Sequence, residues 1–172
     1  KNAAFYYRAA EFYVLHDKEE KLRLYDLFVD LFDRAFAHIP FERSLVPYGE
    51  DGGALPAIRL RPEGRPRGTI VMHGGFDSWI EEFSSWMRFL AARGYDVIAF
   101  EGPGQGGALK KQGLVLDWRW ERPAAAILDH FRLDDVTWLG ISMGGWFCFR
   151  AAAFEPRIKR VIASSIAYDY MK

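Results

Sequence analysis

The chain has 172 residues, half of them apolar, which is enough for one ordinary domain with a buried core. Its 23 basic and 23 acidic residues give a formal net charge of zero, so neither nucleic acid nor an anionic membrane is an expected partner. No apolar run approaches the roughly 18 residues of a membrane span, and the single cysteine, Cys148, cannot form an internal disulfide, which favours a reducing, cytoplasmic location.

Residues 2–39 have apolar side chains at helical spacing and are predicted to form a helical hairpin. Asp17 interrupts the pattern and can cap the second helix. The predicted apolar stripe contains Phe5, Ala9, Phe12, Leu24, Phe28, Leu31 and Ala35. The many aromatic residues indicate a packed hairpin core, although they could also line a substrate pocket. We expect residues 1–39 to form a cap or lid segment and residues 40–172 to form the core of an α/β domain.

Pro40 ends the helical part, and three strands are predicted over residues 41–49, 54–61 and 69–72. Turn residues separate the first two, which therefore read as an antiparallel hairpin. The third lacks polar alternation, as expected of a central strand that is covered on both faces.

A glycine-containing loop, His73-Gly74-Gly75-Phe76, follows the third predicted strand. A helix comes next, with apolar residues at helical spacing from residue 80 to residue 90 and a glycine at residue 94. Ser78 and Glu81 have the spacing of a capping box, which predicts the start of this helix.

The next strand is predicted over residues 97–100, and the loop E-G-P-G-Q-G-G follows it at residues 101–107. Its glycines formally match a dinucleotide-binding pattern. No amphipathic helix opens directly after them, and Pro103 stiffens the turn where a pyrophosphate would approach, so dinucleotide binding is disfavoured. A further helix is predicted over residues 118–131, with Pro123 either in its first turn or at a kink.

Residues 136–139 read as a short buried strand, and residues 143–154 as a helix that is buried on most sides. Between them lies G-I-S-M-G, residues 140–144, which matches the pattern of a strained strand-to-helix turn. Such a turn raises the Ser142 hydroxyl clear of the sheet and leaves the Met143 N–H and the helix dipole facing what the hydroxyl attacks. One more strand is predicted over residues 158–166.

This alternation of strands, glycine loops and helices implies a mostly parallel sheet with right-handed crossovers. From about residue 41 to the end, the sequence resembles the α/β-hydrolase superfamily. Residues 100–106 (F-E-G-P-G-Q-G), with H-G-G at 73–75 and the helical N-terminal segment, are similar to the subfamily of dihydroxypseudooxynicotine hydrolase and the fungal polyketide-shortening hydrolases. The resemblance implies hydrolysis of an ester, or of a carbon–carbon bond next to a ketone, by Ser, Asp and His without a metal or cofactor.

Carried over by position, the resemblance makes Ser142 the nucleophile and the Met143 N–H one donor of an oxyanion hole. The second donor would be the N–H of Gly75 or of Phe76, and the residues leave this choice open. His73 could be considered as the base, but its place at the head of the oxyanion loop favours a role in bracing that loop.

The chain departs from the family pattern because all four histidines precede Ser142, whereas the family places acid and histidine after the nucleophile. Asp169 could be the acid, although a structural carboxylate is the favoured interpretation. We therefore interpret the chain as the N-terminal half of a hydrolase, whose remaining strands, acid and histidine lie beyond Lys172 or on another chain.

Three other interpretations stay open: a truncated binding protein without chemistry, an acyltransferase that uses the same serine, and an independent interaction module formed by the helical hairpin. Aromatic residues near the predicted pocket, Phe76, Trp79 and Trp146, suggest a small-molecule substrate with an apolar or aromatic acyl group, although the same positions also suit core packing. Assembly as a homodimer is also open.

Overall fold

The computed structural model describes residues 2–50 and 52–165. The chain divides into two compact units, one up to residue 41 and one from residue 42 onward. The division lies close to the predicted boundary between residues 39 and 40. Each unit is described by itself.

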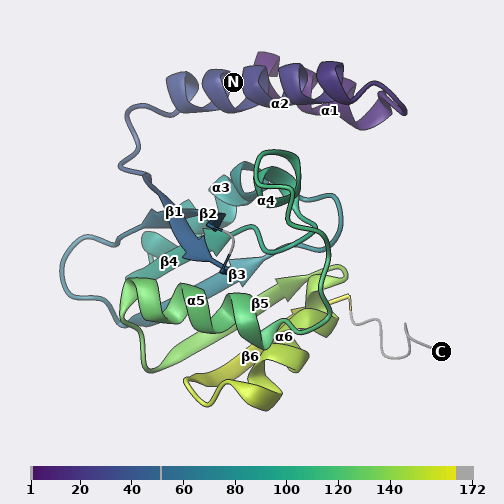
Figure 1. Ribbon diagram of the computed structural model, residues 1–172. Coiled ribbons are helices and arrows are strands. Elements are labelled where there is room, and N and C mark those ends of the chain that lie inside the picture. The colour runs from purple at the N-terminus through teal and green to yellow at the C-terminus, as the bar shows by residue number, and fades with distance from the viewer. Residues whose placement is uncertain (1, 51, 166–172) are drawn as a thin grey trace. The chain divides into compact units, whose positions relative to one another are not determined.

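The N-terminal unit is a pair of helices, α1 (Asn2–Tyr13) and α2 (Lys18–Ala35), which lie side by side (Figure 1). Asp17 caps α2, as predicted, because its carboxylate accepts the N–H of Glu20 at 2.9 Å.

In α2 the predicted stripe is buried at Leu24 and Phe28 and half-buried at Leu31 and Ala35, whereas for α1 the prediction is wrong. Phe28 is fully buried in α2, whereas Phe5 and Phe12 in α1 are 38% and 49% exposed. The side chains that α1 buries include Arg8 and Glu11. Burial of these charges is tolerated because they pair at 3.3 Å, and Lys21 of α2 also contacts Glu11 at 3.2 Å.

The second unit is built on one sheet of six strands with the order β1-β2-β4-β3-β5-β6. The first two strands form the predicted antiparallel hairpin, and β2 pairs antiparallel with β4. The pairs β4–β3, β3–β5 and β5–β6 are parallel, so the expected mostly parallel part of the sheet is confirmed. The strands are β1 (Glu42–Tyr48), β2 (Gly53–Leu60), β3 (Gly68–His73), β4 (Tyr95–Phe100), β5 (Val136–Ile141) and β6 (Ile158–Ser164).

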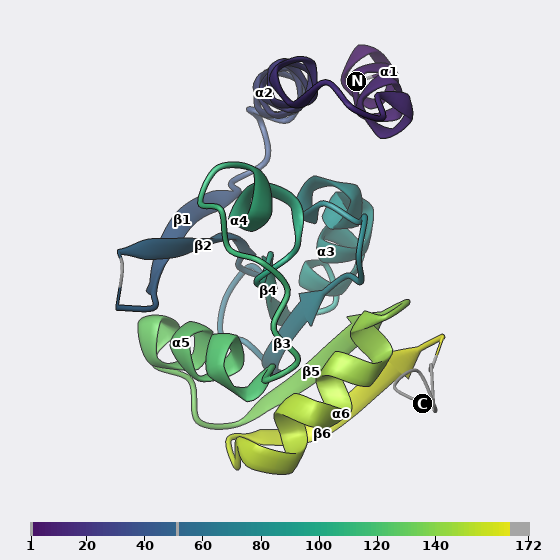
Figure 2. The same cartoon turned by 45° about the vertical axis from the view of Figure 1, so that its right-hand side comes forward.

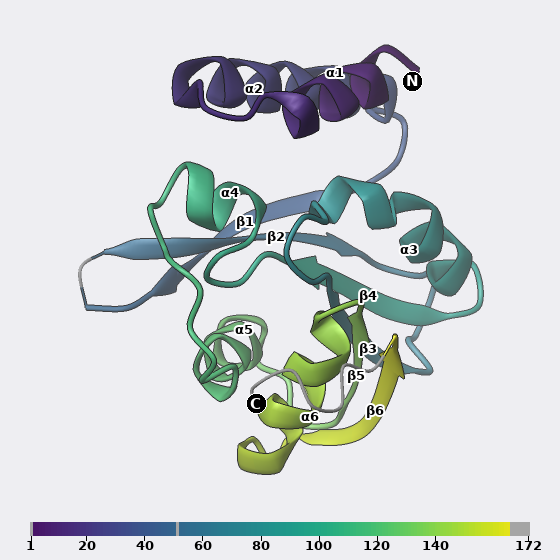
Figure 3. The same ribbon diagram turned by 90° about the vertical axis from the view of Figure 1, so that its right-hand side faces the viewer.

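Helices cover both faces of this sheet. They are the 3-10 turn η1 (Ile80–Phe83) and the helices α3 (Ser84–Ala91), α4 (Gly106–Lys110), α5 (Glu121–Phe131) and α6 (Gly144–Phe154). The chain steps from β3 to β4 in one direction, but from β4 to β5 and from β5 to β6 in the other. Right-handed crossovers therefore place α3 on one face and α5 with α6 on the opposite face (Figures 2 and 3).

The start of the helical segment after β3 differs from the prediction. The residue that precedes the first turn is Trp79, whose N–H donates to the Glu82 carboxylate at 2.8 Å. Ser78 and Glu81 do not form the expected capping box. Glu81 is instead buried and pairs with Arg43 of β1 at 2.8 Å. Its carboxylate therefore makes a long-range ion pair and not the local cap that the spacing predicted.

Two further expectations need correction. Helix α5 begins at Glu121 rather than near residue 118, which places Pro123 in its first turn. Helix α6 is not buried on most sides, because Phe149 and Phe154 are 48% and 60% exposed, although Cys148 is buried as expected. Burial is confined to the α6 side chains that face the sheet and α5.

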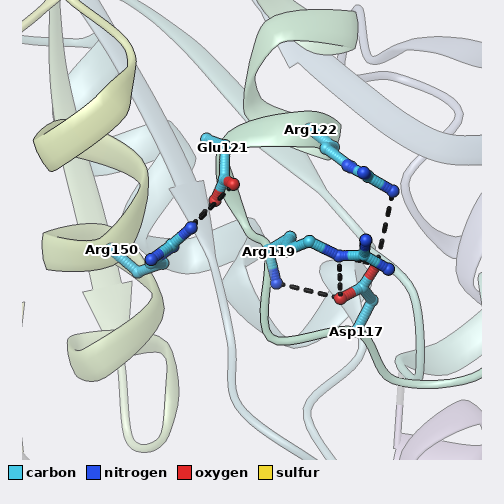
Figure 4. A network of polar contacts seen from close by, with 5 residues as sticks. All are labelled: Asp117, Arg119, Glu121, Arg122 and Arg150. Atoms are coloured by element: carbon cyan, nitrogen blue, oxygen red, sulfur yellow. Dashed lines mark hydrogen bonds and ion pairs between the residues drawn. The ribbon is translucent and has the colours of Figure 1, made fainter.

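The core of the second unit fills the space between the sheet and α5 with α6, and its largest members are Trp120, Trp138, Phe100 and Phe147. At the rim, Glu121 of α5 pairs with Arg150 of α6 at 2.8 Å (Figure 4). The segment before α5 adds local ion pairs of its own around Asp117. In the part of the chain that the structure describes, no helix is both long and apolar enough to cross a membrane.

Candidate active site

The loops that follow β3 and β5 leave the same edge of the sheet side by side. These strands are parallel neighbours, and His73 lies opposite Gly140 in register. The helices that follow them pack on opposite faces, so the order of the strands reverses between β3 and β5. In a parallel sheet, this is the position at which ligands bind.

Ser142 is the first of the two residues between β5 and α6; it has a left-handed backbone conformation, with φ of +60°, and it is exposed. The tightness of the turn explains the flanking glycines. A Cβ atom on Gly140 would lie 1.9 Å from the carbonyl oxygen of Gly144, and a Cβ on Gly144 would lie 2.6 Å from the carbonyl oxygen of Gly74. The chain therefore folds here only with glycine at both positions, and the serine carries the backbone strain.

The loop after β3 lies against this turn. A Cβ on Gly75 would be 2.8 Å from the Met143 nitrogen and 3.2 Å from Cβ of Ser142. Among the described residues, the N–H groups of Met143, Gly75 and Phe76 donate to no protein acceptor. The Met143 amide lies at the start of α6, and the Gly75 and Phe76 amides lie in the loop after β3. Together, such unpaired amides can stabilise a carbonyl oxygen that becomes negatively charged.

His73 is fully buried among aromatic side chains, with ring centroids 5.2 Å from Trp120 and 5.3 Å from Phe100. Its Nδ1 lies 3.0 Å from the carbonyl oxygen of Gly74 and must donate to it, because a carbonyl only accepts. Burial lowers the pKa of His73 to about 4, so the ring is neutral at pH 7. His73 thus braces the loop, and in the described residues it makes no hydrogen bond to Ser142.

Gln105 also holds this loop, a contact that the sequence did not predict. Its Nε2 donates to the carbonyl oxygens of Gly74 and Gly75, each at 2.7 Å, and its Oε1 accepts the Gly102 N–H at 2.9 Å. The side chain is 1% exposed. The sequence feature that could have predicted this contact is a polar residue in a glycine-rich loop directly after a buried strand.

Glu101 also connects the loop after β4 with the segment after β3. Its carboxylate accepts the N–H of Gly107 at 2.6 Å and that of Ile80 at 3.2 Å. Burial, reinforced by the neighbouring Glu81 carboxylate, raises the pKa of Glu101 to about 8. Glu101 and Gln105 therefore tie the loop after β4 to the loop after β3 from the inside.

Comparison with known proteins agrees with this geometry. Residues 68–171 match the family described as the alpha/beta hydrolase fold. The chain belongs to the α/β-hydrolase fold family. Hydrolase acrC of Aspergillus aculeatus is 34% identical to this α/β-hydrolase over 201 residues, and the match covers 97% of this chain and 46% of the relative. The 20-hydroxy-prefusarin hydrolase FUS2 of Gibberella moniliformis is 34% identical over 186 residues, with 94% and 43% covered.

Solved structures show the same fold. The crystal structure of the 2,6-dihydroxy-pseudo-oxynicotine hydrolase superposes with a TM-score of 0.77 at 27% identity, covering 91% of this chain and 45% of that one. The structure of AbyA5 gives a TM-score of 0.78 at 24% identity, covering 92% and 45%. The α/β-hydrolase chain therefore spans less than half the length of each of these relatives.

Of the predicted site residues, the structure brings together Ser142, Met143 and Gly75. Phe76 follows Gly75 in the chain, and its side chain is exposed. Asp169 lies outside the described residues. Trp79 is buried, whereas Trp146 is half-buried. Among the residues that the structure describes, no group of three or more His, Cys, Asp or Glu side chains could hold a metal ion.

Proposed function

We propose that this protein is a serine hydrolase in which Ser142 forms an acyl-enzyme. The observation that carries the proposal is the exposed Ser142 at φ +60°, on a turn that only glycine neighbours allow and that lies against Gly75. The Met143 N–H and an N–H from Gly75 or Phe76 receive the oxyanion. Each such donor contributes about 100- to 1,000-fold to the rate in enzymes of this kind.

The proposed reaction proceeds in two steps. The Ser142 Oγ attacks the substrate carbonyl carbon, its proton passes to an imidazole, and the carbonyl electron pair moves onto oxygen. Collapse of this intermediate breaks either the ester C–O bond or the C–C bond next to a ketone. The leaving alkoxide or enolate takes the proton from the imidazole. Water then hydrolyses the acyl-enzyme, which releases a carboxylic acid and restores the hydroxyl.

The base comes from outside the described residues. His73 is buried, neutral and bonded to Gly74, so it is not available to take the Ser142 proton. We place the acid and the histidine beyond Lys172 or on another chain. The chain's coverage of less than half of its hydrolase relatives supports this placement.

The proposed substrate is a small molecule with an apolar or aromatic acyl group. Phe76 is 48% exposed next to the Gly75 amide, and Trp146 lies one turn into the helix that follows Ser142. These rings offer apolar surface beside the residues of the proposed site. By their names, two of the relatives are hydrolases of 20-hydroxy-prefusarin and of 2,6-dihydroxy-pseudo-oxynicotine.

The experiment is labelling of the full-length protein with a fluorophosphonate probe, followed by a panel of ester and β-diketone substrates. Wild type should label at Ser142, and Ser142→Ala should not. Ser165→Ala is the matched control, because Ser165 is a second exposed serine with positive φ, at the end of the neighbouring strand β6. Labelling that persists in Ser142→Ala would overturn the proposal. A full-length wild type that does not label would favour a binding protein instead, because the probe reacts only with an activated serine.

A further inference from the structure

Gln105 uses its whole carboxamide on one task. Both hydrogens of Nε2 go to successive carbonyl oxygens, those of Gly74 and Gly75, and Oε1 is occupied by the Gly102 N–H. Since carbonyl oxygens only accept, this orientation of the amide is the one that satisfies all three partners. The contacts join segments about 30 residues apart and lie at the loop that borders Ser142.

The direction of these carbonyls determines the direction of two amides. The described residues contain no cis peptide bond, and in a trans peptide the C=O and N–H groups point in opposite directions. The Gly75 N–H shares a peptide with the Gly74 carbonyl, and the Phe76 N–H shares one with the Gly75 carbonyl. Holding both carbonyls toward the buried Gln105 therefore turns both N–H groups away from Gln105.

Gly75 lies beside the turn that carries Ser142, and Phe76 directly follows it. Gly75 borders the Met143 nitrogen and Ser142, and neither the Gly75 nor the Phe76 N–H donates to a protein acceptor. His73 adds a second hold on the Gly74 carbonyl at 3.0 Å. The Gly75 carbonyl has Gln105 as its side-chain donor, so the orientation of the Phe76 N–H depends on Gln105 in particular.

Gln105 is itself held in place. The two carboxylate oxygens of Glu101 accept N–H groups from Gly107 and Ile80, which fixes the loop on both sides. A Cβ on Gly106 would lie 2.0 Å from the Glu101 carboxylate, and one on Gly102 would lie 2.4 Å from the Trp120 ring. The loop therefore has no room to shift, which is what preorganised donors require.

We propose that Gln105 is a positioning residue for the oxyanion hole: its carboxamide orients the Gly74–Gly75 and Gly75–Phe76 peptides so that their N–H groups face the oxygen of a carbonyl bound at Ser142. The inference rests on the function proposed above. It assigns the role of the E-G-P-G-Q-G loop as a support for the hole rather than a site for a nucleotide.

The test uses the full-length protein with p-nitrophenyl butyrate as substrate and phenylboronic acid as a tetrahedral inhibitor. Gln105→Met keeps the side-chain length but removes every hydrogen bond. Gln105→Asn keeps the carboxamide but is too short to reach both carbonyls. In both variants kcat should fall about 100-fold with KM within threefold, because the donors act on the transition state rather than on the bound ester. The Ki for phenylboronic acid should rise by a similar factor.

The matched control is Gln112→Met, which makes the same change at a half-buried glutamine soon after the loop. Its kcat and Ki should equal those of wild type. Thermal melting identifies which variants are folded, and either Gln105 variant suffices if the other does not fold. A kcat within threefold of wild type in a folded Gln105 variant would overturn the inference while Ser142 labelling still stands. A rise in KM with kcat unchanged would also overturn the inference, because it would mean that the loop affects substrate binding and not the transition state. Labelling that persists in Ser142→Ala would instead refute the proposed function, in which Ser142 is the nucleophile.

Discussion

The backbone at residue 142 makes a quantitative prediction that does not depend on the substrate. A non-glycine residue at φ of +60° carries strain that glycine does not, because the Cβ atom approaches neighbouring backbone. We therefore expect Ser142→Gly to be more stable than Ser142→Ala, although both remove the hydroxyl. Elsewhere in regular structure the order of these two residues is normally the reverse.

The magnitude follows from two opposing effects. The left-handed conformation costs a residue with a Cβ about 1 to 2 kcal/mol. Alanine offsets part of this because it restricts the unfolded chain relative to glycine, by about 0.4 to 1 kcal/mol. The free energy of unfolding of Ser142→Gly should thus exceed that of Ser142→Ala by roughly 0.5 to 1 kcal/mol. With a urea m-value of about 2 kcal/mol/M, the midpoint should differ by roughly 0.25 to 0.5 M.

Urea unfolding of the two variants, followed by circular dichroism, measures this difference. The control is Ala125→Gly in the middle of α5, where the same glycine should lower the free energy of unfolding by about 1 kcal/mol. Opposite signs at the two positions are the expected result. If Ser142→Gly is less stable than Ser142→Ala, residue 142 does not carry the strain that the turn requires, and the argument for a raised hydroxyl fails.

Two other predictions concern stability. The folded state keeps His73 neutral with a pKa of about 4 against 6.5 unfolded, so below pH 6.5 the unfolded chain gains a proton that the folded chain refuses. As pH falls from 6.5 to 4, the free energy of unfolding of wild type should fall by about 3 kcal/mol relative to that of His73→Asn, which has no titrating group at this position. Glu101 has the opposite pH dependence, but it is present in both proteins and its effect cancels. Parallel pH profiles for the two proteins would contradict the prediction. Asp17→Ala should destabilise the helical unit by about 1 kcal/mol in thermal melting through loss of the α2 cap, whereas Asp17→Asn should stay near wild type.

The sequence by itself determined the features that depend on neighbouring residues. Helical spacing and the Asp17 cap placed α2, and uninterrupted β-branched and apolar runs placed the central strands. The G-I-S-M-G pattern identified the turn at Ser142, because a tight strand-to-helix turn needs small residues at positions 140 and 144. These are properties of short, contiguous stretches of chain.

Only the tertiary structure decided which distant groups meet. Gln105 reaches Gly74 and Gly75 because β4 and β3 are neighbours in the sheet, and Glu81 leaves its local cap for Arg43 on β1. The buried face of α1 likewise follows from ion pairing with α2 rather than from its apolar stripe. Strand order and side-chain pairing arise from packing over the whole unit, so no local spacing in the chain could specify them.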